Sequence, residues 1–256
     1  MKIPPRLRAI MASCILTAAC ATSSPTSGLP QPNKIIALVR SDSCDAAALR
    51  ARADAAGQAL AASHATTWVA VDFAANPNHN VDMLGRPSPY LAVVLAVAPR
   101  QALPALARDL QGALGDQCRV DIYEVAQRRL VDPRRTWPLG EPSPTPTSFL
   151  MLHRKEGLTL QQFNAIWENP HAQMAIAAAP AGRRYVQSVV ISRLGEDAPA
   201  LDGIGETGGG PAGPPQTAAE QAAATAQRLQ VAQHSQLFLD SPKTGMFTAQ
   251  EVILKD

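Results

Sequence analysis

The sequence predicts an α+β fold in which two ferredoxin-like β-α-β-β-α-β repeats form one pseudo-dimeric α/β barrel. Three observations predict it. The same order of apolar strands and helices occurs twice, a proline-rich segment separates the two copies, and some strands are apolar on both faces. The chain has 256 residues, of which 46% are apolar and 17% are charged, so a sizeable core is expected.

The first repeat is predicted over residues 34–130. Short runs rich in valine, leucine and aromatic residues indicate strands, and alanine- and leucine-rich segments between them indicate helices. Pro104 lies in the first turn of the second helix, where a missing N–H costs little. The expected strands are 35–39, 67–75, 90–98 and 119–125, and the expected helices are 45–62 and 100–114.

The second repeat is predicted over residues 148–256, after a linker at 131–147 that contains five prolines. Thr159 and Gln162 form a capping box, which marks a helix start, and Pro170 is expected to end or bend this helix. The expected strands are 149–153, 184–194, 201–207 and 246–254, and the expected helices are 159–174 and 217–233.

Apolar faces predict how the two repeats meet. Strands 35–39 and 91–97 are apolar at both parities, whereas an antiparallel sheet with one solvated face should alternate. Two helices cover only one face of a four-stranded sheet, so the sheet of the second repeat is expected to cover the other face. The sequence leaves open whether the chain also forms oligomers.

The N-terminus has the layout of a bacterial secretory signal. A basic start over residues 1–8 precedes an uncharged, mostly apolar run over 9–19, and small residues surround Cys20. We therefore expect residues 1–20 to be a signal peptide, 21–33 to be a flexible tether, and the protein to be exported. Cys20 resembles the lipidated cysteine of a lipobox, so both a membrane-anchored lipoprotein and a soluble periplasmic form are expected outcomes. The alternative is an N-terminal helix that belongs to the core.

Two cysteines lie outside this segment, Cys44 and Cys118. Cys44 follows the first strand and Cys118 precedes the fourth, and in a β-α-β-β-α-β unit these strands are antiparallel neighbours. An oxidising compartment would allow the two thiols to pair. We therefore predict a Cys44–Cys118 disulfide, with two separate thiols as the alternative.

The second repeat carries several separated sequence motifs. They are His-Arg-Lys-Glu-Gly-Leu-Thr at 153–159, a helix with Phe163 and Trp167 followed by His171-Ala172, Arg-Arg-Tyr-Val-Gln at 183–187, Asp-Gly-Ile-Gly-Glu at 202–206 and Phe-Leu-Asp at 238–240. In this order, over roughly residues 148–256, they resemble the EthD family. The first repeat lacks the Phe/Trp/His signature and resembles a degenerate copy.

The resemblance implies a dimeric α/β barrel. EthD family members are linked to ether degradation, in an accessory role, and fungal relatives to dehydration or decarboxylation of aromatic polyketides. Barrels of this superfamily also host cofactor-free oxygenases and cyclases, and fold alone does not decide among these activities. The family usually places a Trp and another bulky residue after the last motif glutamate, where this chain has Gly208–Gly210.

His171 is the candidate catalytic residue. The resemblance marks it, and a histidine that faces the space between helix and sheet can act as a general base near neutral pH. Phe163, Trp167, His171 and Met174 recur at helical spacing and are expected to share one face. The alternative is a structural histidine that hydrogen-bonds a neighbouring carbonyl where Pro170 disturbs the helix.

Trp167, Tyr185 and His153 are the candidate ligand-binding residues. His153 shares strand parity with Phe149 and Met151, so we expect it to enter the same cleft, between the helices and the sheet of the second repeat. Trp167 and Tyr185 also suit a packing role.

The composition argues against several classes of function. The chain has 23 basic and 21 acidic residues, a net charge of +2 and 4% aromatic residues, a composition unlike that of a nucleic-acid-binding protein. Its histidines are scattered and it has no nucleotide-binding glycine loop, so no metal or cofactor is expected. We therefore expect the second repeat to bind, and in one version to transform, a small apolar or aromatic compound. The alternative is a non-catalytic envelope protein, a binding or scaffold lipoprotein.

Overall fold

The computed structural model describes residues 31–40, 44–74, 81–82, 84–116, 118–179, 183–195, 197–210 and 217–256. Its helices and strands are β1 (Gln31–Arg40), α1 (Ala46–Ala62), β2 (Trp68–Ala74), β3 (Tyr90–Val97), α2 (Leu103–Leu114), β4 (Val120–Val131), β5 (Thr147–Leu152), α3 (Leu160–Ile166), α4 (Ala172–Ala178), β6 (Arg184–Arg193), β7 (Gly203–Gly208), α5 (Ala218–Ser235) and β8 (Gly245–Lys255). The predicted signal peptide and Cys20 lie outside the described residues. None of the described helices combines the length and apolar character needed to cross a membrane.

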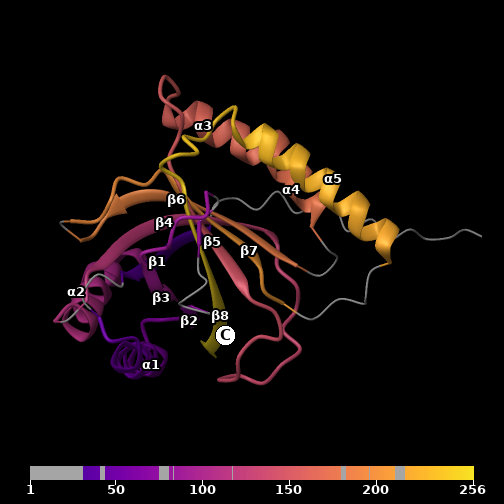
Figure 1. Ribbon diagram of the computed structural model, residues 1–256. Helices are drawn as coiled ribbons and strands as arrows, with labels where there is room; N and C mark the ends of the chain where they lie inside the picture. Colours follow the sequence, from indigo (N-terminus) through magenta and orange to yellow (C-terminus); the bar gives the residue numbers. More distant parts are fainter. Residues whose placement is uncertain are drawn as a thin grey trace, which may run out of the picture.

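The strands close into one antiparallel barrel with the helices outside it (Figure 1). The order around the barrel is β1-β3-β2-β8-β5-β7-β6-β4. Each repeat contributes four adjacent strands in an equivalent order, β4-β1-β3-β2 and β8-β5-β7-β6. The two sheets join where β2 pairs with β8 and where β4 pairs with β6. The predicted fold class is confirmed.

Strand β1 shows why strands of this barrel are apolar on both faces. Ile35 and Ala37 belong to the core between the first sheet and the helices α1 and α2. Ile36 and Leu38 point the other way, into the barrel interior, where they share a core with Phe247 of the second repeat. The helices of the first repeat cover one side of the barrel and those of the second repeat the other (Figure 1).

The first long helical segment of the second repeat is interrupted. Helix α3 ends at Ile166, a π-helical turn spans Trp167–His171, and α4 continues to Ala178. Within the turn Asn169 is extended, with φ −158° and ψ 125°. Pro170 has no backbone N–H to donate, so a regular hydrogen-bond pattern cannot run through it. The predicted bend is confirmed, and the segment continues beyond its predicted end.

Strand pairing within and between the repeats lengthens some strands beyond their predicted limits. Strand β4 runs to Val131 because its second half pairs with β6 of the other repeat. Strand β1 begins at Gln31, inside the predicted tether, where it pairs with Gln127 of β4. In the predicted linker, the Ser143 N–H donates to the Glu251 carbonyl oxygen of β8 over 2.8 Å. This segment therefore lies along the barrel.

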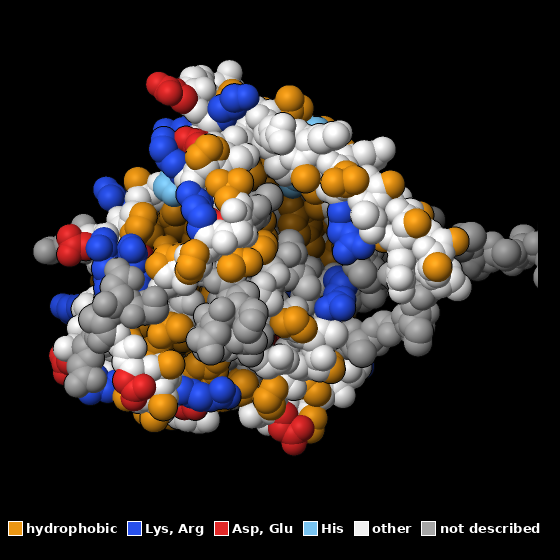
Figure 2. All heavy atoms as spheres, viewed as in Figure 1, with side chains coloured by type: hydrophobic (Ala, Val, Ile, Leu, Met, Phe, Trp, Pro, Cys, Tyr) orange, Lys and Arg blue, Asp and Glu red, His pale blue; other side chains and the backbone are white. Residues whose placement is uncertain are grey.

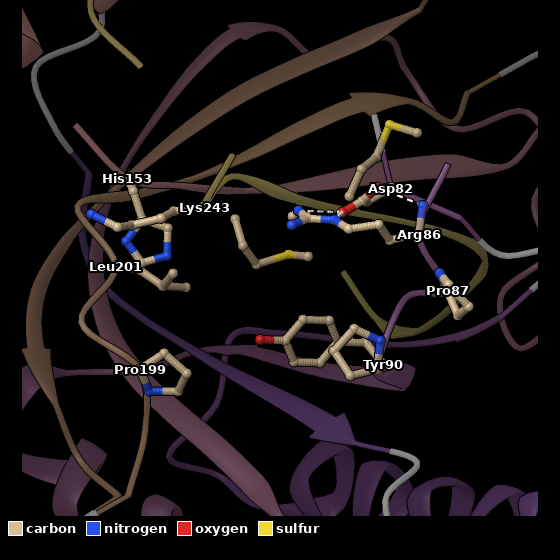
Figure 3. Close-up of a pocket in the computed structure, with 12 residues that line it drawn as sticks. Asp82, Arg86, Pro87, Tyr90, His153, Pro199, Leu201 and Lys243 are labelled. Atoms are coloured by element: carbon tan, nitrogen blue, oxygen red, sulfur yellow. Dashed lines mark hydrogen bonds and ion pairs between the residues drawn. The ribbon is translucent and has the colours of Figure 1, made fainter. Parts of the chain in front are cut away.

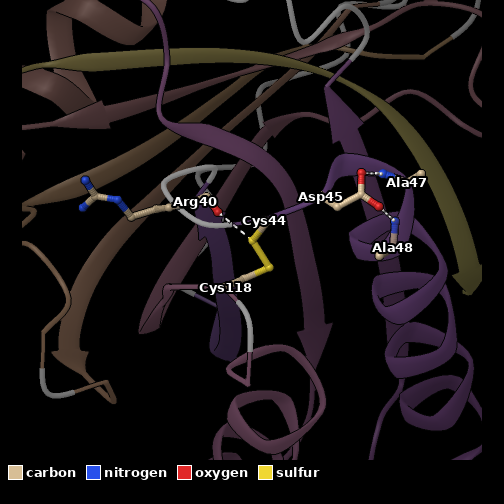
Figure 4. Close-up of a disulfide and its surroundings, with 6 residues drawn as sticks. All are labelled: Arg40, Cys44, Asp45, Ala47, Ala48 and Cys118. Carbon is tan, nitrogen blue, oxygen red and sulfur yellow. Dashed lines mark hydrogen bonds between the residues drawn. A yellow bond between two sulfur atoms is a disulfide. The ribbon is translucent and has the colours of Figure 1, made fainter.

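The predicted Cys44–Cys118 disulfide is present (Figure 4). The two Cα atoms are 5.3 Å apart. Val39 and Val120, close by on β1 and β4, are partners in the antiparallel ladder, which is the neighbour relation that the prediction used. Asp45 caps α1 by accepting hydrogen bonds from two backbone amides of its first turn. The bridge thus ties the start of α1 to the segment that leads into β4.

Candidate functional site

A cleft of about 410 Å³ lies between the helices α4 and α5 and the sheet of the second repeat. We call it the helix–sheet cleft. Figure 2 shows a hollow beneath this helix pair, with apolar side chains in its floor and basic side chains at its edge. Helix α5 packs against α4 and not flat on the sheet, and of its described residues only Ser235 is buried. The cleft is lined by Pro146, Ser148, Ala175, Ala178, Ala179, Arg183, Arg184, Tyr185, Thr207, Gly208, Arg228 and Val231.

Three arginines and no acidic residue are among the lining residues of the helix–sheet cleft. The guanidinium of Arg184 is neutralised by Glu251, and its Nε lies 3.4 Å from Oδ1 of Asp132. Arg183 and Arg228 form no ion pair with any residue that the structure describes. Arg228 donates hydrogen bonds to the Ala224 carbonyl oxygen and the Thr225 hydroxyl of its own helix, both of which are neutral. The cleft therefore presents two positive charges that no described carboxylate neutralises, beside an apolar wall.

Of the four predicted site residues, Tyr185 lines the helix–sheet cleft, whereas His153, Trp167 and His171 do not. Burial raises the pKa of its phenol, and the phenol oxygen accepts a hydrogen bond from Nε2 of Gln187 over 3.1 Å. The same amide group donates to the Trp167 carbonyl oxygen over 2.8 Å. These bonds connect β6 to the π-helical turn and hold the Tyr185 ring in the cleft wall.

Trp167 is packed in the core of the second repeat. It is 2% exposed, and its ring centroid lies 5.5 Å from that of Phe163. Its ring fills space left by two glycines, because a Cβ on Gly203 would lie 2.6 Å from Trp167 Cζ3 and one on Gly205 3.8 Å from Cζ2. The glycines of the Asp-Gly-Ile-Gly-Glu motif therefore make room for the indole. These contacts favour the packing role that the sequence left open.

His171 lies between α5 and the ring of Phe238. Its Nδ1 is 3.3 Å from Nδ1 of His234, so one of the two nitrogens donates and the other accepts, and the rings stack with centroids 5.4 Å apart. The rings of Phe238 and His171 also meet in an edge-to-face arrangement, with their centroids 4.9 Å apart. Burial, and then the proximity of His234, lower the pKa of His171 to about 4. Such a histidine is a weak base at neutral pH, and its contacts fit the structural alternative, with a ring in place of the expected carbonyl partner.

His153 lies at a different place from Tyr185. Along β5, Phe149 and Met151 face the barrel interior, whereas Leu152 faces the helices. The predicted parity of His153 with the first two residues holds, but the face that it defines is the barrel interior and not the helix side. His153 therefore lines a second cavity at one end of the barrel, and the sheet separates it from the helix–sheet cleft.

A group of buried charged residues, the interior charge cluster, lies inside the barrel and joins the two repeats. Nζ of Lys34 is 2.5 Å from Oε1 of Glu206. Asp72 is the strand partner of Glu251, which also pairs with Arg184. Lys34 and Asp72 belong to the first repeat and the other three residues to the second, so the cluster bridges both halves.

Burial perturbs the acid–base behaviour of the interior charge cluster. It lowers the pKa of Lys34 although Glu206 acts in the opposite direction. Burial, and then the negative charge of Glu251, raise the pKa of Asp72 well above its ordinary value. Sequence reasoning missed this cluster; its signal is a charged residue inside an apolar strand, as Asp72 is in β2. Among the described residues, no three or more His, Cys, Asp or Glu side chains are grouped so that they could hold a metal ion.

The comparisons with known proteins agree on the fold. No protein-family model and no curated protein matches the sequence. The solved structure of an anthrone oxidase-like protein matches with a TM-score of 0.53 and 9% identity, over 88% of this chain and 95% of that chain. That of a candidate monooxygenase from Lactobacillus acidophilus NCFM matches with a TM-score of 0.50 and 7% identity, over 88% of this chain and 97% of that chain. These likenesses show the fold, a pseudo-dimeric α/β barrel formed by the two repeats of one chain.

Proposed function

We propose that the helix–sheet cleft binds a small apolar or aromatic compound that carries an acidic group. The observation that carries the proposal is the lining: Ala178 and Val231 form an apolar wall beside Arg183 and Arg228, whose charges no described residue neutralises. A guanidinium recognises a carboxylate or sulfonate through parallel charge-assisted hydrogen bonds. Apolar walls with a few polar groups are the usual design of a small-molecule site.

Binding is the activity that these side chains support. The titratable residues of the cleft wall are three arginines and Tyr185, whose pKa is raised, and none of them is a base at neutral pH. His171 has a pKa of about 4 and is held by His234 and Phe238. This favours the non-catalytic alternative. Because an anthrone oxidase-like protein and a candidate monooxygenase share the fold, oxidation of the bound aromatic compound is the reaction to assay.

Calorimetric titration with two matched probes tests the proposal. 1-Naphthoate carries a carboxylate, and 1-naphthamide has the same rings without the charge. We expect the carboxylate to bind and the amide to bind about tenfold more weakly, because a charge-assisted hydrogen bond is lost. Arg228→Gln should weaken naphthoate binding by about the same factor, whereas Arg108→Gln, an exposed arginine on α2, should leave it unchanged.

A second pair of variants tests where the probe binds. Ala175 lines the helix–sheet cleft, and Ala177 is exposed on the same helix. Ala175→Phe should fill the cleft and abolish naphthoate binding, while Ala177→Phe should preserve it. Equal affinity for naphthoate and naphthamide, or naphthoate binding that survives both Arg228→Gln and Ala175→Phe, would contradict the proposal.

We further propose that the second repeat is an EthD-type unit. Its motifs support this because each of them has a structural task. Asp202 pairs with Arg154, the motif glycines accommodate Trp167, and Glu206 pairs with Lys34. An experimental structure of an EthD family member should superimpose its signature Trp on Trp167 of this chain. A Trp in another place would contradict the assignment.

We also propose that the protein is exported and anchored through a lipid on Cys20. The basic start and the uncharged run before Cys20 support this, and the Cys44–Cys118 disulfide suits an oxidising compartment. Intact-mass analysis of the membrane fraction should find a processed chain that begins at a modified Cys20. A cytoplasmic protein that still begins at Met1 would contradict export, and a Cys20→Ser variant that stays on the membrane would contradict the lipid anchor.

A further inference from the structure

A second cavity, the barrel-mouth cavity, opens at one end of the barrel and has a volume of about 300 Å³ (Figure 3). Both repeats contribute to it, through the segment before β3, the end of β5, the segment before β7 and the start of β8. It lies on the inner face of the sheet, so it is separate from the helix–sheet cleft. Its lining residues are Asp82, Arg86, Pro87, Pro89, Tyr90, Met151, His153, Pro199, Leu201, Lys243, Gly245 and Met246.

The wall of the barrel-mouth cavity is mainly apolar. The Tyr90 ring forms one side, and its centroid lies 6.3 Å from that of Phe247 in the barrel core. Prolines and thioethers supply most of the remaining surface, and in Figure 3 Pro199 and Leu201 lie on the same side of the cavity as His153, across from Pro87. Flat rings with thioether neighbours form favourable surfaces for an aromatic ligand.

The charged residues at the rim are already paired. The Arg86 guanidinium donates to Asp82, with Nε and Nη2 both 2.6 Å from Oδ2. Burial alone would raise the pKa of Asp82, but the hydrogen bonds from the Arg86 side chain and from nearby backbone amides hold it below its ordinary value. Nζ of Lys243 lies 2.8 Å from Oδ2 of Asp240. A ligand in this cavity therefore meets no uncompensated charge from these side chains, in contrast to the helix–sheet cleft.

His153, also in the wall, forms no ion pair with a described residue. Its ring makes no hydrogen bond with any described residue, whereas its backbone carbonyl accepts from the Asp240 N–H over 2.9 Å. Partial burial lowers the pKa of His153, although the carboxylates of Asp202 and Asp240 act in the opposite direction. The imidazole is therefore neutral at neutral pH, with one nitrogen able to accept a hydrogen bond.

We propose that the barrel-mouth cavity is a second ligand site, for a neutral hydroxylated aromatic compound of one or two rings. The aromatic ring packs on Tyr90 and the proline wall, and the ligand hydroxyl donates a hydrogen bond to the imidazole of His153. The volume is at the lower end of the range for small-molecule sites, about 300–1,000 Å³, which limits the ligand to this size. This proposal does not depend on the function of the helix–sheet cleft.

Titration of the full chain with 2-naphthol tests the second site. We expect saturable binding to one site, weakened about fivefold to tenfold by His153→Leu through the loss of one hydrogen bond. His64→Leu, which removes an exposed histidine before β2, is the matched control and should bind 2-naphthol as the unaltered protein does. Met246→Trp should fill the cavity and abolish binding, and a thermal melt of each variant verifies that it is folded.

Crossing the variants of the two cavities decides whether the sites are separate. Arg228→Gln and Ala175→Phe should leave 2-naphthol binding unchanged, and Met246→Trp should leave 1-naphthoate binding unchanged. Naphthol binding that is lost in Ala175→Phe and retained in His153→Leu would overturn the proposal, because the probe would then occupy the helix–sheet cleft. Absence of binding at millimolar naphthol would overturn it as well.

Discussion

The two repeats share one strand order, but their helices pack differently. In the first repeat, α1 and α2 lie against the sheet, and side chains such as Leu49 and Leu110 are buried in the core that the helices and the sheet form together. In the second repeat, α4 and α5 pack on each other and leave the helix–sheet cleft beneath them. The same topology thus has a closely packed core between helices and sheet in the first repeat and a cleft lined by arginines in the second.

The difference has its origin in side-chain volume. The buried face of α2 carries Leu103, Leu106, Leu110 and Leu114 at helical spacing, which fills the space above the sheet. Helix α5 consists largely of alanine and glutamine, and of its described residues only Ser235 is buried, so its side chains do not fill the space above the sheet. The large apolar side chains of α2 therefore fill the space above their sheet, whereas beneath α5 the space is left open for a ligand.

One of the two largest expected effects concerns the disulfide, which reinforces only the first repeat. The loop that it closes spans 74 positions, for which the chain-entropy model gives an upper figure on the order of 4 kcal/mol. Replacing both Cys44 and Cys118 by serine should therefore lower the free energy of unfolding by about 2–4 kcal/mol in urea titrations. Reductant should cause the same loss in the unaltered protein and none in the double variant. An unchanged urea midpoint would show that the bridge does not constrain the unfolded chain.

The second effect compares one leucine from each repeat. Leu110 of α2 is 1% exposed, whereas Leu229 of α5 is 61% exposed. Leu110→Ala should cost about 2–5 kcal/mol of unfolding free energy because it leaves a cavity in a filled core. Leu229→Ala should change it by less than about 0.5 kcal/mol. Similar losses in both variants would mean that α5 is covered in solution, for example by a second molecule.

The sequence was sufficient to predict the fold because runs of apolar residues mark the strands. The apolar runs at both parities of β1 and β3 predicted a covered inner face, and the strand order placed Cys44 beside Cys118. Strand ends were less predictable. Beyond its predicted end, β4 has three polar residues in a row, Gln127, Arg128 and Arg129, and all three pair with β6 of the other repeat.

The candidate site was less predictable because its geometry depends on which face of the sheet a residue reaches. Parity correctly grouped His153 with Met151, but parity cannot tell the barrel interior from the helix side. Helical spacing placed Trp167 and His171 on one face, where they became packing residues. Arg228 went unnoticed, because an arginine on an exposed helix carries no signal until the fold shows the hollow beside it.

The third effect is a pH dependence located in the second repeat. Burial, and then the proximity of His234, lower the pKa of His171 from its ordinary value of 6.5 to about 4 in the folded chain, so between these pH values the unfolded chain binds more protons. The stability contributed by the neutral imidazole is complete above pH 6.5 and is lost as the pH falls toward 4. The full shift corresponds to about 3 kcal/mol, and we expect about 2 kcal/mol after allowing for its partial contact with solvent.

Urea titrations of the unaltered protein and of His171→Leu at pH 7, 6, 5 and 4.5 measure the contribution of His171 to the free energy of unfolding. The difference between the two proteins isolates His171 from other titrating groups. One of these is Asp72, whose raised pKa makes its own contribution run in the opposite direction. If both proteins lose stability equally on acidification, His171 is not shielded as described.

The smallest effect compares the N-terminal caps of the two long helices. Asp45 caps α1 by accepting from two backbone amides, and Thr217 caps α5 in a capping box with Glu220. Removing either side chain by substitution with alanine should cost its helix about 1 kcal/mol. Helix α1 is part of the filled core and can unfold only with the barrel, so Asp45→Ala should lower the global free energy of unfolding by that amount.

Helix α5 buries little and can open while the barrel stays folded. Thr217→Ala should therefore leave the global free energy of unfolding within about 0.5 kcal/mol of its original value. The same change should accelerate amide hydrogen exchange in α5 about fivefold, since 1 kcal/mol shifts the opening equilibrium by that factor. Urea titration measures the first quantity and native-state hydrogen exchange the second. If Thr217→Ala instead lowers global stability as much as Asp45→Ala does, α5 unfolds together with the barrel. The helix–sheet cleft would then be covered by a helix that does not open separately.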